Sequence, residues 1–166
     1  MNLKKPRIND ITLVNLLGPD IYKLKILANE YSVVSPKGKP HFVRPATGKL
    51  PKLYVVSCDS ALLYVGVSRQ SLSTRFRGGM QASGEDGYYG YAWSKTDRDL
   101  RLDIWYLDGA PEDSISVELE TIEAEVVYLF RLESGQWPSD QTEIHFHRST
   151  GFHRMSAQRV LGKLKE

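Results

Sequence analysis

The alternation of apolar and polar residues along the chain predicts three strands and an additional one near the N-terminus. Residues 21–28 set Leu24, Ile26 and Ala28 against Lys23 and Lys25, which predicts a half-buried strand. Residues 53–57 and 62–67 are runs rich in β-branched and aromatic residues, and the Asp59-Ser60 pair between them favours a turn. These two runs predict a hairpin, and the alternating residues 100–107 predict the third strand.

Apolar residues at helical spacing predict a long helix over about residues 114–133. Its stripe is Ile115, Leu119, Ile122, Val126 and Leu129, at intervals of 4, 3, 4 and 3. Residues 71–76 predict a shorter helix that ends at Gly78-Gly79, and a first helix is predicted from Asn9 or Asp10 to Gly18. Residues 143–146 predict a short strand, and a basic helix follows.

This order of elements predicts an α/β or α+β fold, with a small three-stranded antiparallel sheet flanked by helices. Residues 31–51 contain four prolines and two glycines and predict a loop or short irregular strands. We therefore expect three parts: a basic N-terminal extension, 1–51, packed on the core; a main unit, 52–148; and a basic C-terminal helix, 149–166. A length of 166 residues is sufficient for one good core.

Composition excludes a membrane protein. The longest apolar run, residues 61–67, is far shorter than the roughly 20 residues that cross a bilayer. The basic start has no apolar block of signal-peptide length, so secretion by that route is not expected. The single cysteine, Cys58, cannot form an intrachain disulfide, which is consistent with a reducing cytoplasm.

Charge is segregated along the chain although the net charge is only +2. Residues 1–80 carry 13 Lys and Arg against 4 Asp and Glu, a net +9, whereas residues 81–142 carry 4 against 14, a net −10. Residues 143–166 carry 5 against 2, a net +3. Either the basic parts contact a polyanion while the acidic part holds a cation, or the two kinds of surface neutralise each other within the fold.

The stretch "KLYVVSCDSALLYVGVSRQSLSTRFRGG" places Tyr54 and Tyr64 ten positions apart and Arg75 eleven positions later. Each residue alone has a structural explanation, as a cross-strand packing pair and a solvated helix residue. Together they resemble the GIY-YIG nuclease family, in which a strand ending in tyrosine pairs with a strand carrying Tyr-(Ile/Val)-Gly, followed by an arginine-bearing helix. The resemblance continues through "EAEVVYLFRLESGQWPSDQTEIHF" and covers about residues 52–146.

The resemblance implies a divalent-metal-dependent endonuclease that hydrolyses phosphodiester bonds in DNA, with Mg²⁺ or Mn²⁺ as cofactor. By position, Glu125 is the metal ligand, Tyr54 and Tyr64 orient and activate water, Arg75 binds the phosphate, and Gln141 closes the site. A tyrosine base requires a nearby cation, because its ordinary pKa is about 10. Arg75 and the metal are the candidates for that cation.

Helical geometry does not distinguish Glu125 from Glu123. At 100° per residue, both lie about 80° from the centre of the apolar stripe, on opposite sides. The register of the family motif selects Glu125, and Glu123 is the second candidate.

The sequence departs from the family pattern in three places. Lys52-Leu53 replaces Gly-Ile, Gln141 replaces an asparagine, and Gly79 stands where the family often has Tyr or His. One of Tyr88, Tyr89 or Tyr91 is a candidate to fold back and replace that missing ring. These departures motivate an alternative, a catalytically weak nucleic-acid-binding or protein-interaction module on the same scaffold.

Further candidates lie outside the motif. Sequence preference could come from the basic extension, from a homodimer or from a partner. Glu143, His145 and His147 share one face of the predicted strand, where they could bind a transition metal or bond locally. The loop "GEDGYYGYAWSK" offers aromatic faces beside a lysine, so it either contacts a nucleic acid or packs on the sheet. The candidate nucleic-acid contacts are Lys23, Lys25, Arg69, Arg77, Trp93 and Lys95.

Overall fold

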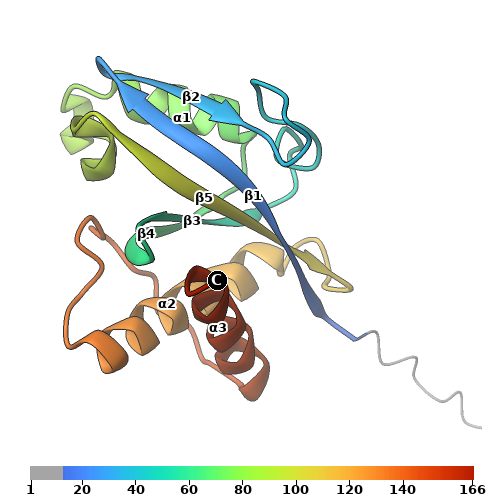
Figure 1. Cartoon of the computed structure of the whole chain (residues 1–166). Helices are drawn as coiled ribbons and strands as arrows, with labels where there is room; N and C mark the ends of the chain where they lie inside the picture. Colours follow the sequence, from blue (N-terminus) through green and yellow to red (C-terminus); the bar gives the residue numbers. More distant parts are fainter. Residues whose placement is uncertain (1–12) are drawn as a thin grey trace, which may run out of the picture.

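The computed structural model describes residues 13–166 as one antiparallel sheet covered by helices on both faces (Figure 1). The strands are β1 (Asn15–Leu27), β2 (Glu30–Val34), β3 (Lys52–Cys58), β4 (Ala61–Ser68) and β5 (Arg98–Asp108). The α-helices are α1 (Leu72–Gln81), α2 (Ile115–Ser134) and α3 (Gly151–Leu164). Two short 3₁₀ helices, η1 (Glu85–Gly87) and η2 (Ala92–Lys95), lie between α1 and β5.

The sheet has the strand order β2-β1-β5-β3-β4, and all neighbours are antiparallel. The mixed α+β class is therefore confirmed, but the predicted three-stranded sheet is wrong, because the sheet has five strands. The three strands predicted for the main unit, β3, β4 and β5, are adjacent in it. The difference arises because β1 is long and pairs with β5 through ten residue pairs, so the N-terminal hairpin extends the sheet.

Residues of the interior strand β3 point alternately to two hydrophobic clusters, as a pleated strand requires. Tyr54 and Val56 face the cluster that α1 covers, together with residues from the loops around Phe42 and Trp93. Leu53 and Val55 face the cluster that α2 and α3 cover. Figure 1 shows α1 and the pair α2 and α3 on opposite sides of the sheet. β4 is an edge strand, so side chains from both layers can meet along it.

The predicted helix that ends at Gly18 is wrong for residues 15–18, which belong to β1; its start at Asn9 or Asp10 lies outside the described residues. A short apolar stretch fits either period, and pairing with β5 decides for the strand. The β1–β5 register shifts between Leu17 and Asp20, where Pro19 has no N–H to donate.

Two further boundaries differ from the sequence-based prediction. Helix α1 does not stop at Gly78-Gly79 but continues to Gln81, because Gly79 is buried by packing within the fold. Residues 143–146 form no strand. The basic C-terminal helix is present as α3, and its inner face, including Val160 and Leu161, joins the core.

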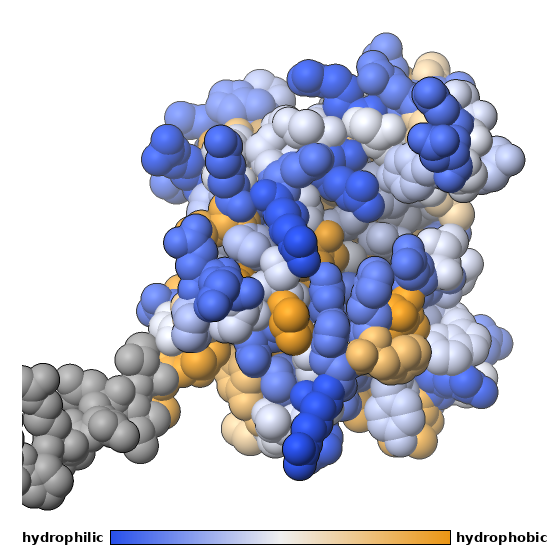
Figure 2. Space-filling model, turned by 180° about the vertical axis from the view of Figure 1, so that it is seen from behind, coloured by the Kyte–Doolittle hydropathy of each residue, from blue (hydrophilic) through white to orange (hydrophobic). Residues whose placement is uncertain are grey.

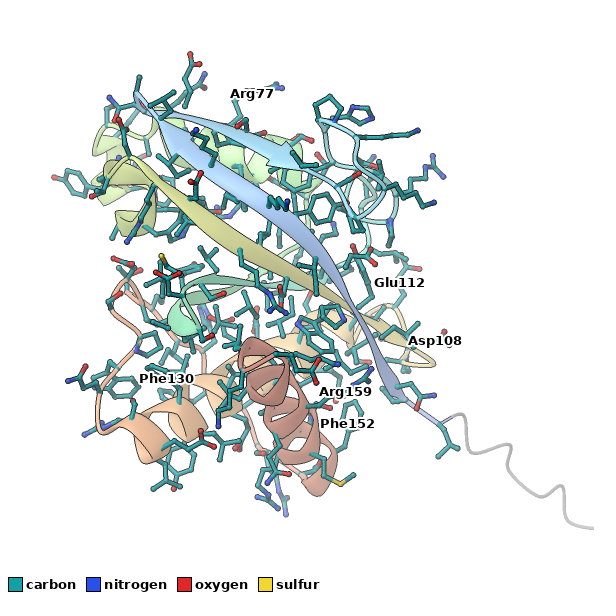
Figure 3. All side chains as sticks on the ribbon, in the orientation of Figure 1. Arg77, Asp108, Glu112, Phe130, Phe152 and Arg159 are labelled. Atoms are coloured by element: carbon teal, nitrogen blue, oxygen red, sulfur yellow. The ribbon has the colours of Figure 1, made fainter. Side chains whose placement is uncertain are left out.

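The surface seen from behind is largely hydrophilic, with hydrophobic residues in small separate patches (Figure 2). Among residues 13–166 no helix is long and apolar enough to cross a membrane. Arg77 of α1 lies on one side of the sheet, and Phe152 and Arg159 of α3 lie on the other (Figure 3).

Candidate active site

The two tyrosines of the sequence motif lie against each other in the β3–β4 hairpin. The ring centroids of Tyr54 and Tyr64 are 5.8 Å apart. Gly66 of β4 is the register partner of Tyr54. A Cβ at position 66 would lie 2.7 Å from the Tyr54 hydroxyl oxygen and 2.7 Å from Cε1 of Tyr64. The glycine of the Tyr-Val-Gly triplet is therefore required for the two rings to occupy these positions.

A third tyrosine, Tyr91, joins the pair from the loop before η2. Its hydroxyl lies 3.0 Å from that of Tyr54 in a buried hydrogen bond. Tyr91 occupies the space over Gly79 of α1, where a Cβ would lie only 2.3 Å from Cε2 of the Tyr91 ring. The ring expected four residues after Arg75 is thus replaced by a ring from the loop, and Gly79 provides the room for it.

Arg75 projects from α1 toward these rings. Its guanidinium carbon lies 5.5 Å from the centroid of Tyr91 and 5.8 Å from that of Tyr88, within range of cation–π attraction. Burial acts to lower the pKa of Arg75, but the nearby phenols, Tyr91 foremost, raise it above its ordinary value. The guanidinium is therefore a permanent positive charge beside the tyrosines.

None of the three phenols is activated by the protein alone. Burial raises the pKa of Tyr54 well above its ordinary value, and Tyr91 also adds to the rise. Burial likewise raises the pKa of Tyr64 and of Tyr91, although Arg75 opposes the rise in both. The expectation that Arg75 lowers a phenol pKa below its ordinary value is not met, so the phenols are protonated at neutral pH.

The structure brings Glu123, and not Glu125, to the tyrosines. Glu123 is 5% exposed, and its charge contributes to the raised pKa of Tyr64. Seven residues before it on the same side of α2, Ser116 accepts a hydrogen bond of 2.9 Å from Nε of Arg69. Glu125 shares the other side with Glu118, whose Oε2 lies 2.7 Å from Nε2 of His153 in α3. The side of α2 that carries Glu125 therefore faces α3.

Glu123 is surrounded by other carboxylates. Burial, followed by repulsion from Glu120 and Glu143, raises the pKa of Glu123 to about 8. The Gln141 amide opposes this shift, with its Nε2 3.4 Å from Oε1 of Glu123. This buried carboxyl is poised to ionise when a cation approaches it.

The side chain of Gln141 is hydrogen-bonded to the backbone at the edge of β4. Its Oε1 accepts a hydrogen bond of 2.9 Å from the Val65 N–H, and its Nε2 donates to the Val65 carbonyl at 3.0 Å. The same nitrogen donates to the Glu143 carbonyl at 3.0 Å, so both of its hydrogens are used. The side chain thus completes the ladder of an edge strand and holds the 138–143 segment against the site.

A surface cleft of about 390 Å³ opens over Tyr64 and Arg75. Its walls come from the 87–92 loop and the 140–143 segment, so α1, β4 and two loops contribute to it. Tyr54 is fully buried behind this cleft, whereas Tyr64 and Arg75 are partly exposed to it. The cleft therefore offers the phenols of Tyr64 and of the 87–92 loop, the guanidinium of Arg75, and the carboxylates of Asp140 and Glu143. Glu123 does not line it but is close enough to raise the pKa of Tyr64.

Lys52, which replaces the family's glycine, has a structural role. It is fully buried, and its Nζ donates hydrogen bonds of 2.8 Å to the carbonyls of Gly48 and Gln70. These bonds tie the loop before β3 to the turn that precedes α1. Burial lowers the pKa of Lys52 to about 8.

The candidate nucleic-acid contacts fall into different places. Trp93 is 0% exposed and stacks on Tyr91, with ring centroids 4.6 Å apart, so it presents no face to a ligand. Lys95 and Arg77 are exposed, and neither lines the cleft. Arg69 lies beside the cleft, bound to Ser116 and 3.7 Å from Glu120.

Lys23 and Lys25 are exposed on β1, two strands away from β3 across the sheet. Within residues 13–166 neither forms an ion pair. They border a separate shallow hollow with Ser32, Val34 and Asp99. Their surface is distinct from the tyrosine cleft.

The His residues of "EIHFH" form one pair within the segment and one pair with α2. Nε2 of His145 lies 3.4 Å from Oε1 of Glu143, and Nε2 of His147 lies 2.7 Å from Oε2 of Glu120. The part of the chain that the structure describes holds no group of three or more His, Cys, Asp or Glu side chains able to share one metal ion. Of the two interpretations of this segment, transition-metal binding or bonding to nearby side chains, the second agrees with the observed contacts.

A divalent cation with a single protein carboxylate fits this site chemically. Mg²⁺ keeps several waters and takes substrate phosphate as a ligand, so it does not need a protein cage. Glu123 offers the carboxylate, and the repulsion by Glu120 and Glu143 that raises its pKa is relieved by a cation. Glu123, buried next to the cleft, is therefore the residue that would hold the ion.

Comparisons with known proteins identify no relative. A scan against models of known families finds no match for the chain, and searches of curated proteins and of solved structures find none either.

Proposed function

We propose that the protein is a divalent-metal-dependent endonuclease that hydrolyses phosphodiester bonds in DNA at the cleft over Tyr64 and Arg75. The observation that carries this proposal is the convergence of three groups from separate elements: a phenol of β4, a guanidinium of α1 and a buried carboxylate of α2. A phosphodiesterase needs charge stabilisation on the phosphate, an oriented water and a cation site, and these groups supply each one.

Arg75 binds the non-bridging oxygens of the scissile phosphate. Its planar fork can donate two hydrogen bonds, and the rings of Tyr88 and Tyr91 fix its plane. Tyr54 is buried and bonded to Tyr91, so it positions the other rings and does not meet the substrate. Tyr64, at the cleft surface, orients the attacking water through its hydroxyl.

Glu123 takes the role of metal ligand that the sequence motif assigns to Glu125. The bound ion would stabilise charge on the phosphate and lower the pKa of the nearby water and phenol. Its binding requires Glu123 to lose its proton, so affinity for the ion should rise with pH toward the Glu123 pKa of about 8. Gln141 supports the site by fixing the 138–143 segment to β4.

A second candidate, a nucleic-acid-binding module without efficient hydrolysis, is favoured by one observation. Both amide hydrogens of Gln141 are used by backbone carbonyls, so this residue has no donor left for substrate. Such a module would bind DNA through Arg75 and cut slowly or not at all.

Nicking of supercoiled plasmid separates the two candidates. We expect conversion to the open circular form with Mg²⁺ or Mn²⁺ and none in chelator, with faster conversion at pH 8 than at pH 6.5. Retained plasmid binding without metal-dependent nicking at either pH would support the module instead. The same reaction with a structured RNA shows whether RNA is also cut.

A further inference from the structure

Three surface hollows at the candidate active site share lining residues, so they lie next to one another and are connected through those residues. A hollow of about 290 Å³ beside Arg69 shares Arg75 with the tyrosine cleft. The cleft in turn shares Thr142 and Glu143 with a hollow of about 420 Å³. We call these three connected hollows the trough.

The first end of the trough is cationic. It is lined by Arg69 and Arg75, and the one carboxylate that lines it, Glu120, contacts Arg69 and His147. Arg69 is largely exposed, with 69% of its side chain accessible. This end therefore presents positive charge to a phosphodiester backbone.

The other end of the trough is aromatic. Trp137 and Phe146 line the third hollow and are 50% and 78% exposed, unusually high values for large apolar side chains. The guanidinium carbon of Arg131 lies 4.6 Å from the Trp137 ring centroid, which places a positive charge at this end as well. The nearby Glu143 carboxylate is 3.4 Å from His145.

We propose that the trough binds a nucleic acid with an unpaired segment next to the scissile phosphate, its backbone along Arg69 and Arg75 and a base stacked on Trp137 or Phe146. This inference rests on the proposed function of the central cleft. A base within a duplex is already stacked on both faces, so exposed aromatic rings can stack only with unpaired bases. Arg131 beside Trp137 adds attraction for the flanking phosphates. The preferred substrate is therefore a single strand, or a duplex with a gap or overhang.

Binding in chelator tests this without any cleavage. The full chain is titrated with a fluorescent single strand and with its blunt duplex, at one salt concentration. We expect the single strand to bind more tightly. Trp137→Ala should weaken single-strand binding by roughly 5- to 100-fold and leave duplex binding unchanged, with a smaller loss for Phe146→Ala.

A spectroscopic signal isolates the stacking contact. Trp93 and Trp105 are fully buried and Trp137 is half exposed, so quenching of tryptophan fluorescence by bases reports on Trp137. We expect the single strand to quench the wild type and not Trp137→Ala, and Trp137→Phe to retain most of the affinity. Tyr128→Ala is the matched control, because this exposed aromatic of α2 lies outside the trough.

Equal losses of single-strand and duplex affinity for Trp137→Ala, or no quenching by the single strand, would overturn the inference. So would a dimer that Trp137→Ala and Trp137→Phe both dissociate without a change in single-strand affinity, since the aromatic end would then be a self-association surface. Failure of plasmid nicking with intact stacking would instead remove the proposed hydrolysis and leave the binding mode.

Discussion

The two sides of helix α2 carry similar residues in opposite surroundings. One side, with Ser116, Glu120 and Glu123, faces the tyrosine cleft and the 138–143 segment. The other, with Glu118 and Glu125, faces α3, where Glu118 meets His153. Glu123 is buried with a pKa raised to about 8, whereas Glu125 is partly exposed. The chemistry of a carboxylate here is decided by what packs on its side of the helix.

The proposed function conflicts with folding stability only on the side of α2 that carries Glu123. A buried carboxyl that repels its neighbours costs folding free energy at neutral pH unless a cation or a proton compensates it. Glu125 carries no such cost. A buried carboxyl with a strongly raised pKa is one of the features that mark candidate functional residues, and it motivates the proposed ligand role of Glu123.

The largest expected effect is the difference between the two glutamates in catalysis. Glu123→Gln should reduce the metal-dependent single-turnover nicking rate by about 10³-fold or more, because a metal ligand contributes several kcal/mol to transition-state stabilisation. Glu125→Gln, the matched control two residues away, should cut at close to the wild-type rate. An inactive Glu125→Gln variant would support Glu125 as the metal ligand, as the register of the family motif implies. It would contradict the assignment of Glu123.

The next effect concerns Arg75, which lines the cleft together with Tyr64. Arg75→Lys keeps the charge but loses the bidentate fork, so we expect about a 10²-fold slower single-turnover rate at saturating protein. Arg77→Lys, on the exposed surface of the same helix, is the control and should have no effect. Wild-type activity for Arg75→Lys would reduce this residue to a point charge.

Much of the fold was predictable because local patterns agree with the tertiary structure. The hairpin of β3 and β4, strand β5 and helix α2 lie within a residue or two of their predicted bounds. The failures are positions where distant partners decide. Residues 15–18 become strand through β5, and Gly79 stays helical because Tyr91 packs on it.

The sequence predicted those residues of the candidate site that the family motif fixes. It did not predict those whose place depends on the rotation of a helix about its own axis. Tyr54, Tyr64 and Arg75 converge as the motif implies. Glu123 and Glu125 are equivalent by helical period, and tertiary contacts distinguish the two sides: Ser116 with Arg69 on one, Glu118 with His153 on the other. For the loop that contains Trp93, the sequence left open contact with a nucleic acid or packing on the sheet, and the burial of Trp93 agrees with packing for this residue.

A pH-dependent stability difference should distinguish the two glutamates without any substrate. The folded-state pKa of Glu123 is raised from an ordinary value near 4.5 to about 8. Its contribution to stability is therefore fully present below about pH 4.5 and is lost as pH rises toward 8. Glu123→Gln mimics the protonated form, so its advantage over wild type should grow across this window, to on the order of 2 kcal/mol.

Urea unfolding in chelator at pH 5 and pH 8 measures this difference. Lys52 and Asp103 also have shifted pKa values, but both proteins share them, so they cancel in the comparison. Glu125→Gln should show no such trend. Parallel stability curves for wild type and Glu123→Gln would mean that the carboxylate is solvated at neutral pH.

The smallest effect tests whether the surface on β1, remote from both sides of α2, also contacts DNA. If Lys23 and Lys25 each neutralise a phosphate, replacing both with glutamine should flatten the salt dependence of duplex affinity by about two units of slope. That corresponds to about a tenfold smaller affinity loss between 50 and 200 mM salt. The single-turnover rate at saturation should not change, because neither residue lies near Tyr64 or Arg75.

The competing explanation is that these lysines serve the fold, since Lys25 is the register partner of Asp99 in β5. Within residues 13–166 neither lysine forms an ion pair, and both side chains are exposed. The free energy of unfolding of the double variant should therefore lie within about 0.5 kcal/mol of the wild-type value. Affinity titrations at several salt concentrations, paired with thermal melts, decide between the two. An unchanged slope with a lowered melting temperature would restrict DNA contact to the trough and assign the β1 lysines to stability.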